Sequence, residues 1–211
     1  MAMLIRMLFF WLVVKPFLLL AIGITVRGRG NLEVEGPALI VSNHNSHLDT
    51  VVLLDLIGVT RMERFRPVAA ADYFETSRPL SFLTRLLFNI LPIRRTRDDQ
   101  GDDPLESMAL SIAAGDSLIL YPEGTRGEPE KLTRFRAGAG RLIQRFPDVA
   151  VIPVYMHGLG RILPRGSWYP VPFLARVNIG EPRRYSGSIE EITERLEDVI
   201  QRLGRQCRDE E

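Results

Sequence analysis

One polar stretch of the sequence, residues 42–49 with the letters SNHNSHLD, carries residue types that do acid–base chemistry. It follows directly on a short apolar run that indicates a buried strand. A neutral imidazole can take a proton from a hydroxyl group, and a carboxylate bonded to the other ring nitrogen holds the ring in orientation. His44 and Asp49 supply these two groups. Open α/β sheets bind ligands at the carboxyl ends of their strands, which is where this stretch lies.

The spacing of this pair requires a turn. His44 and Asp49 are five residues apart, so a continuous helix would put them on different faces. If Ser46 is the N-cap of a helix, Asp49 takes the N3 position of a capping box and its carboxylate points back towards His44. This predicts a base with an orienting acid and no adjacent serine nucleophile, which suits deprotonation of a substrate hydroxyl. In the alternative interpretation, Ser46 and Asp49 only cap a helix and His44 fills a loop.

A metal site is a competing hypothesis for the same residues. His44, His47 and Asp49 offer three ligands, as in a metal-dependent hydrolase. Two histidines three apart with one carboxylate form a loose signature. The remaining histidine, His157, lies on a separate segment.

A second polar stretch, residues 120–127 with the letters LYPEGTRG, also follows an apolar run. Its glycines flank Thr125 and Arg126, so backbone amides and a guanidinium can meet an anion such as a phosphate. Arg136, near a predicted helix start, or Arg94 and Arg95, at the end of a predicted strand, can complete the anion site. The alternatives are a polar turn with an exposed arginine, and surface arginines paired with nearby aspartates.

Alternating strand and helix signals surround these stretches. They predict an α/β protein with a mixed, largely parallel sheet flanked by helices. A capping box from Ser188 to Glu191 opens the last helix. Strands are expected at 38–42, 67–71, 89–93, 117–121, 150–155 and 174–179, and helices at 51–56, 80–88, 104–115, 137–146 and 189–203.

Composition limits the function classes. A chain of 211 residues suits one domain with a short appendage. The net charge of +1 excludes a bulk electrostatic nucleic-acid binder. The single cysteine, Cys207, excludes a disulfide framework and a cysteine-based zinc site.

Residues 1–26 are predicted to form a membrane-anchoring helical segment, and residues 27–211 the catalytic domain. The apolar run is long enough to cross a bilayer. Lys15 and Pro16 interrupt its middle, however, which favours two short helices in one leaflet. Arg6 and Lys15 are then expected to reach the headgroups. A spanning helix remains the alternative.

The motifs together resemble those of the glycerolipid acyltransferases. Asn43-His44 followed after four residues by Asp49 resembles the NHx4D motif of that family. Residues 121–126 resemble its F/Y-P-E-G-T-R block, residues 135–138 its F-[KR]-x-G block, and residues 151–154 its V-x-P-V strand. Residues 93–95 approximate its arginine-ending second block. The resemblance covers about residues 27–160, in the family's order.

The resemblance implies an enzyme close to 1-acyl-glycerol-3-phosphate acyltransferase. His44 would be the base and Asp49 its orienting acid, with no metal, cofactor or covalent intermediate. The donor would be acyl-coenzyme A or an acyl-carrier protein, the acceptor a lysophospholipid, and the location the cytoplasmic face of the cell membrane. Another lysolipid acceptor, an acylated amino-acid lipid precursor or a membrane-bound protein without catalysis remain alternatives. The implied substrate-binding residues are Arg95, Glu123, Gly124, Thr125, Arg126 and Arg136.

Overall fold

A computed structural model describes residues 1–71, 78–94, 103–125, 130–162, 171 and 173–209. Seven strands form one sheet in the order β1-β7-β6-β2-β5-β3-β4. Every neighbouring pair is parallel except β6–β7, so β1 and β7 run opposite to the other five. This confirms the predicted mixed, largely parallel sheet. The strands are β1 (Ile22–Arg27), β2 (Ala38–Ser42), β3 (Phe65–Ala70), β4 (Leu91–Ile93), β5 (Ser117–Leu120), β6 (Ala150–His157) and β7 (Phe173–Ile179).

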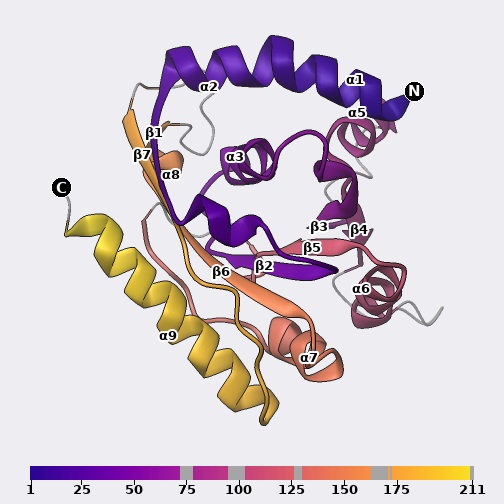
Figure 1. Ribbon diagram of the computed structural model, residues 1–211, viewed down its shortest axis with the longest axis vertical. Helices are drawn as coiled ribbons and strands as arrows, with labels where there is room; N and C mark the ends of the chain where they lie inside the picture. The colour runs from indigo at the N-terminus through magenta and orange to yellow at the C-terminus, as the bar shows by residue number, and fades with distance from the viewer. Residues whose placement is uncertain (72–77, 95–102, 126–129, 163–170, 172, 210–211) are drawn as a thin grey trace.

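Helices cover both faces of the sheet (Figure 1). On one face lie α3 (His47–Ile57) and the N-terminal helical segment, with α5 (Arg78–Phe88) beside the latter. The other face carries α6 (Pro104–Ala113), α7 (Ala137–Arg145) and α9 (Ile189–Arg208). Shorter helical turns are Arg29–Leu32, Met62–Arg64 and α8 (Leu159–Ile162).

Strand β2 is buried on both faces because it lies in the middle of this three-layer arrangement. Ile40 packs into the core beneath α3, while Leu39 and Val41 pack into the core beneath α6, α7 and α9. Side chains alternate along a strand, so an uninterrupted apolar run is what a doubly covered strand requires. The carboxyl end of β2 therefore projects from a rigid centre.

The N-terminal segment is one continuous helix rather than two. It consists of α1 (Ala2–Phe9), a π-helical turn (Phe10–Val14) and α2 (Lys15–Ala21). In the π turn the Lys15 N–H bonds to the Phe10 carbonyl, five residues back. Pro16, which has no N–H, follows this widened turn, and such turns accommodate an interruption without ending the helix.

The helical segment is also shorter than the predicted residues 1–26. Residues Ile22–Arg27 form the edge strand β1, which pairs with β7 in parallel. The alternating apolar residues Ile22, Ile24 and Val26 continued the apolar run of the helix, so the sequence concealed the change of element.

One face of the N-terminal helix is fastened to the domain. Phe10, Val14 and Leu18 are buried at four-residue spacing. Arg6 is also buried, and its Nε donates to the Leu86 carbonyl at 2.6 Å. Lys15 Nζ lies 3.9 Å from an Asp55 carboxylate oxygen. Both cations therefore point to the protein, contrary to the expectation that they reach outwards.

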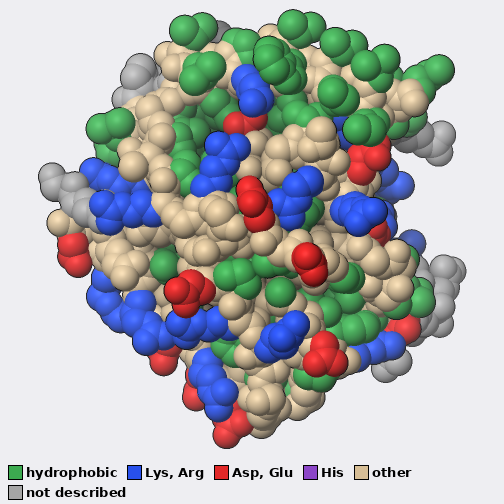
Figure 2. Space-filling model, in the orientation of Figure 1, with side chains coloured by type: hydrophobic (Ala, Val, Ile, Leu, Met, Phe, Trp, Pro, Cys, Tyr) green, Lys and Arg blue, Asp and Glu red, His purple; other side chains and the backbone are tan. Residues whose placement is uncertain are grey.

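The opposite face of this helix is apolar and exposed, and hydrophobic side chains crowd that edge of the molecule in Figure 2. By length and composition, Ala2–Leu20 could cross a membrane, since its 19 residues have a mean hydropathy of 2.1. The exposed large side chains are Met1, Met3, Leu4, Ile5, Leu8, Trp11, Leu12, Val13, Leu19 and Leu20.

Candidate active site

The polar stretch after β2 turns into α3 through the predicted capping box. Ser46 is the N-cap in extended conformation, and its Oγ accepts from the Leu48 N–H at 3.3 Å. The Ser46 N–H donates to Asp49 Oδ2 at 2.8 Å. The cap aims the carboxylate backwards along the chain, towards the residues that precede the helix.

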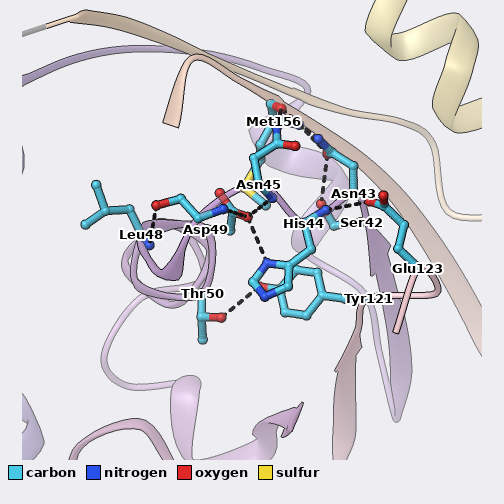
Figure 3. A network of polar contacts seen from close by, with 11 residues as sticks. Ser42, Asn43, His44, Asn45, Leu48, Asp49, Thr50, Tyr121, Glu123 and Met156 are labelled. Carbon is cyan, nitrogen blue, oxygen red and sulfur yellow. Dashed lines mark hydrogen bonds and ion pairs between the residues drawn. The ribbon is translucent and has the colours of Figure 1, made fainter. Parts of the chain in front are cut away.

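This turn brings His44 and Asp49 together (Figure 3). His44 Nδ1 lies 2.9 Å from Asp49 Oδ2. The Asp49 side chain is fully buried, whereas the His44 side chain is 17% exposed. With the proton on Nδ1 directed at the carboxylate, Nε2 is the nitrogen that can accept a proton. The arrangement is that of a general base held by its orienting acid.

Three hydrogen-bond donors meet one oxygen of the Asp49 carboxylate. Its Oδ2 accepts from His44, from the Ser46 N–H and from the Asn45 N–H at 2.6 Å. Burial raises the pKa of Asp49, and these three donors oppose the rise because they favour the charged form. A carboxylate in contact with Nδ1 stabilises the imidazolium that forms when His44 takes a proton.

Tyr121 holds the imidazole from a second direction. Its ring stacks on His44 with centroids 4.0 Å apart and planes 18° apart. Its hydroxyl lies 2.8 Å from Thr50 Oγ1 on α3. Burial raises the pKa of Tyr121, which keeps the phenol neutral. The sequence identified Tyr121 only as part of the second motif. Its place next to His44 follows from the pairing of β2 with β5 in the sheet.

Two asparagines fix the turn against β6. Asn43 Nδ2 donates to the Met156 carbonyl at 2.8 Å, and Asn43 Oδ1 accepts from the Met156 N–H at 2.8 Å. Asn45 Nδ2 also reaches the Met156 carbonyl, at 3.1 Å. Asn43 therefore bonds both the N–H and the carbonyl of Met156, as a neighbouring strand would. This partner could not be predicted from the asparagines themselves, because it lies more than 100 positions away in the sequence.

Glu123 links the two polar stretches. It is 4% exposed, and its Oε1 accepts from the His44 N–H at 2.8 Å. Its Oε2 accepts from the Thr133 N–H at 3.0 Å and from Thr133 Oγ1 at 2.6 Å. Both oxygens thus bond protein groups. We interpret Glu123 as a residue that shapes the loop rather than one that touches a ligand.

Arg136 lies against the glycine of the second stretch. Gly124 has φ +75°, and a Cβ built there would lie 2.8 Å from Arg136 Nε. The backbone of this position therefore favours glycine, and the Arg136 guanidinium lies over the space that a side chain would fill. Arg136 is exposed at the N-cap of α7, and Thr125 is also exposed. The other two candidate phosphate ligands, Arg95 and Arg126, lie outside the described residues.

The three ligands of the metal hypothesis do not converge. His47 is exposed at the first position of α3, while Asp49 turns back to His44. His157 pairs instead with Glu130, at 2.5 Å between Nδ1 and Oε2. Within the part of the chain that the structure describes, no three histidine, cysteine or acidic residues gather as metal ligands do.

Comparison with known proteins assigns the family. The family described as Acyltransferase matches residues 23–157, which include both polar stretches. The chain belongs to this family. It is 30% identical over 145 residues to the chloroplastic 1-acyl-sn-glycerol-3-phosphate acyltransferase LPAT1 of Arabidopsis thaliana, covering 68% of this chain and 38% of that protein. It is 27% identical over 139 residues to 1-acyl-sn-glycerol-3-phosphate acyltransferase alpha of Mus musculus, covering 65% and 46%.

The fold is also shared with a solved structure. The crystal structure of the 1-acyl-sn-glycerophosphate acyltransferase PlsC from Thermotoga maritima superposes with a TM-score of 0.73 at 22% identity, covering 92% of this chain and 75% of that one. The chain spans less than half the length of the two relatives above, at 38% and 46%.

Proposed function

We propose that this protein transfers a fatty acyl group from a thioester donor to the free hydroxyl of 1-acyl-glycerol-3-phosphate and so forms phosphatidate. The observation that carries the proposal is the 2.9 Å contact between His44 Nδ1 and the buried Asp49. It prepares a base at the carboxyl end of a central strand. The names of the relatives supply the substrate class, and Arg136 beside the second loop fits an anionic headgroup.

The reaction needs one base and no covalent enzyme intermediate. His44 Nε2 takes the proton of the acceptor hydroxyl while that oxygen attacks the thioester carbonyl. The tetrahedral intermediate expels the thiolate, which receives the proton from the imidazolium and leaves as free thiol. Asp49 holds the ring and stabilises its positive charge throughout. The donor is acyl-coenzyme A or an acyl-carrier protein.

The acceptor phosphate is assigned to arginines. Arg126, with Arg95 and Arg136, would hold it by charge-assisted hydrogen bonds. The loop around them is shaped by Glu123, Gly124 and Thr125. A phosphate-free or zwitterionic acceptor leaves these guanidinium groups without their partner, so it should bind more weakly.

The same proposal includes a membrane location. The exposed apolar face of Ala2–Leu20 would lie in one leaflet, because the opposite face is packed on the domain through Phe10, Val14 and Leu18. A helix fastened along its length cannot also stand across the bilayer. Since thioester donors are cytosolic, the domain would face the cytoplasm.

An acceptor panel tests the chemistry. Purified protein in detergent is given acyl-coenzyme A and one of three acceptors, and free thiol is measured. Lysophosphatidate should give the highest kcat/KM, roughly tenfold to a hundredfold above monoacylglycerol, because charge-assisted bonds contribute about 1.5–3 kcal/mol. Lysophosphatidylcholine serves as the zwitterionic comparison. Preference for it would replace the proposed headgroup, and absence of thiol release with every acceptor, from acyl-coenzyme A and from an acyl-carrier protein alike, would refute acyl transfer.

Arg126→Ala sharpens the acceptor assignment. It should raise the KM for lysophosphatidate by about ten- to a hundredfold and leave the donor KM unchanged. Monoacylglycerol is the matched control, since it lacks the phosphate. An equal loss with both acceptors would give Arg126 a structural role instead.

A further inference from the structure

Helix α5 belongs to the same layer as the N-terminal helix. The ring of Phe88, its last residue, packs edge-on against Phe9 and Phe10 with centroids 5.9 and 6.2 Å away. Arg6 reaches across to the Leu86 carbonyl at 2.6 Å. This guanidinium binds at the carboxyl-terminal end of α5, where unpaired backbone carbonyls favour a cation. The two helices are thus locked to each other.

The first half of α5 leaves large apolar side chains uncovered. Phe82 is 70% exposed and Leu83 is 48% exposed. Pro79, one turn earlier on the same side, is also exposed. Single exposed apolar residues are common on soluble proteins, whereas adjoining ones beside a further apolar face mark an interaction surface.

The charges of both helices favour lipid over a protein partner. Residues 1–21 and 78–88 contain no aspartate or glutamate, and their only ionisable side chains are Arg6, Lys15, Arg78 and Arg85. Arg85 is exposed on α5. Phenylalanine and leucine on one side of a short helix, with arginine and without acids, is the composition of a helix that lies at an anionic lipid surface.

We propose that α5 inserts Phe82 and Leu83 into the same leaflet as the outer face of Ala2–Leu20, so that the membrane contact has two arms. The inference rests on the proposed membrane location. A single in-plane helix leaves the domain free to roll about the helix axis. A second contact on an adjoining helix removes that freedom. The tilt of the domain and the height of His44 above the lipid are then fixed.

A tryptophan placed at position 82 reports insertion directly. Phe82→Trp is made in the full chain with the two native tryptophans replaced, Trp11→Phe and Trp168→Phe. Vesicles of phosphatidylethanolamine and phosphatidylglycerol, with or without brominated acyl chains, are then added. We expect a blue shift of the emission and quenching by the brominated lipid. If the chain binds the vesicles and the emission stays unshifted and unquenched, the proposal is overturned.

Partitioning provides the quantitative test. The double variant Phe82→Ser/Leu83→Ser should weaken vesicle binding by roughly tenfold or more, since two large apolar side chains leave the lipid. Leu110→Ser is the matched control, because Leu110 is 63% exposed on α6, on the opposite face of the sheet. It should change binding by no more than about twofold. Equal losses in both proteins would overturn the proposal.

The outcomes separate this inference from the proposed function. Thiol release measured in detergent should be unchanged in the double variant, because Phe82 and Leu83 are exposed on α5, whereas His44 and Asp49 lie in the turn between β2 and α3. Vesicle binding lost only in the double variant supports the two-armed contact. Absence of thiol release by the unmodified protein with both thioester donors would refute the acyltransferase chemistry and leave the vesicle result standing.

Discussion

Among the residues that the structure describes, an imidazole–carboxylate pair lies at the carboxyl end of each of two neighbouring strands, β2 and β6. His44 and Asp49 follow β2, with 2.9 Å between Nδ1 and Oδ2. His157 ends β6 and pairs with Glu130, with 2.5 Å between Nδ1 and Oε2. Both contacts join an imidazole Nδ1 to a carboxylate oxygen, but only the His44–Asp49 contact has the geometry of a hydrogen bond. The exposure differs, because the His44 side chain is 17% exposed and the His157 side chain 2%.

The exposure of the ring decides whether such a pair can react with a substrate. A general base must reach a substrate proton, so burying the acid while leaving the ring accessible suits His44. The second pair instead stabilises the backbone around Glu130. Glu130 also accepts from the Gly158 N–H at 2.9 Å, and it holds a backbone φ of +65°, which costs energy for a residue other than glycine. The contacts to His157 and Gly158 stabilise this conformation next to the second loop.

His44→Ala should give the largest effect in this comparison. Loss of the base should lower kcat for thiol release by about 10²–10⁴. Folding should survive, since Asp49 keeps the Asn45 and Ser46 N–H donors and the ring lies in a turn. Steady-state kinetics and a thermal melt check both parts. Near-normal turnover by this variant would refute the proposed mechanism.

His157→Ala should act on stability instead. Removing one of two buried polar side chains in contact costs about 1–3 kcal/mol, which for a domain of this size lowers Tm by roughly 2–12 °C. The kcat of the protein that remains folded should stay within about threefold of the original value, because His157 pairs with Glu130 and ends a different strand from the one before His44. Calorimetry and kinetics at low temperature separate the two quantities. A hundredfold loss of kcat with an unchanged Tm would make the second pair part of the reaction.

The parts of the fold that follow local rules were predictable. The capping boxes at Ser46 and Ser188 needed only a cap residue and an acid three positions later, and both are present. The buried strands β2, β5 and β6 appeared as apolar runs. The edge strand β1 was hidden, because its alternating residues continued the apolar helix that precedes it.

In the candidate site, the predictable part was likewise local. The pairing of His44 with Asp49 spans five residues and follows from the cap. The stack of Tyr121 on His44 and the bonds of Glu123 to Thr133 depend on how loops from separate strands meet, which no spacing encodes. The inward position of Arg6 is of the same kind. Its partners are backbone carbonyls at the end of α5. Every residue has such a carbonyl, so the residue types do not indicate which one is bonded.

Tyr121 should have a moderate effect. Tyr121→Leu removes the stacked ring, and aromatic pairs contribute about 0.5–1.5 kcal/mol, so kcat should fall roughly two- to tenfold. Tyr121→Phe keeps the stack and loses only the bond to Thr50, so it should recover most of that loss. The acceptor KM should change little in both variants. An equal loss in the two variants would assign the role to the hydroxyl instead, because both lack it.

His47→Ala should have the smallest effect, and it is the matched control for His44→Ala. Both residues are histidines of one turn, three positions apart, but His47 is exposed at the start of α3 and Asp49 turns away from it to bond His44. We expect kcat within about twofold of the original value, as for most exposed positions. Adding zinc or a chelator should leave the rate of both the variant and the original protein unchanged. A metal centre built on His44, His47 and Asp49 requires the opposite result, because losing either histidine would remove one of three ligands. Equal collapse of the two alanine variants, with a rate that falls on chelation, would therefore replace the base mechanism by metal-dependent hydrolysis.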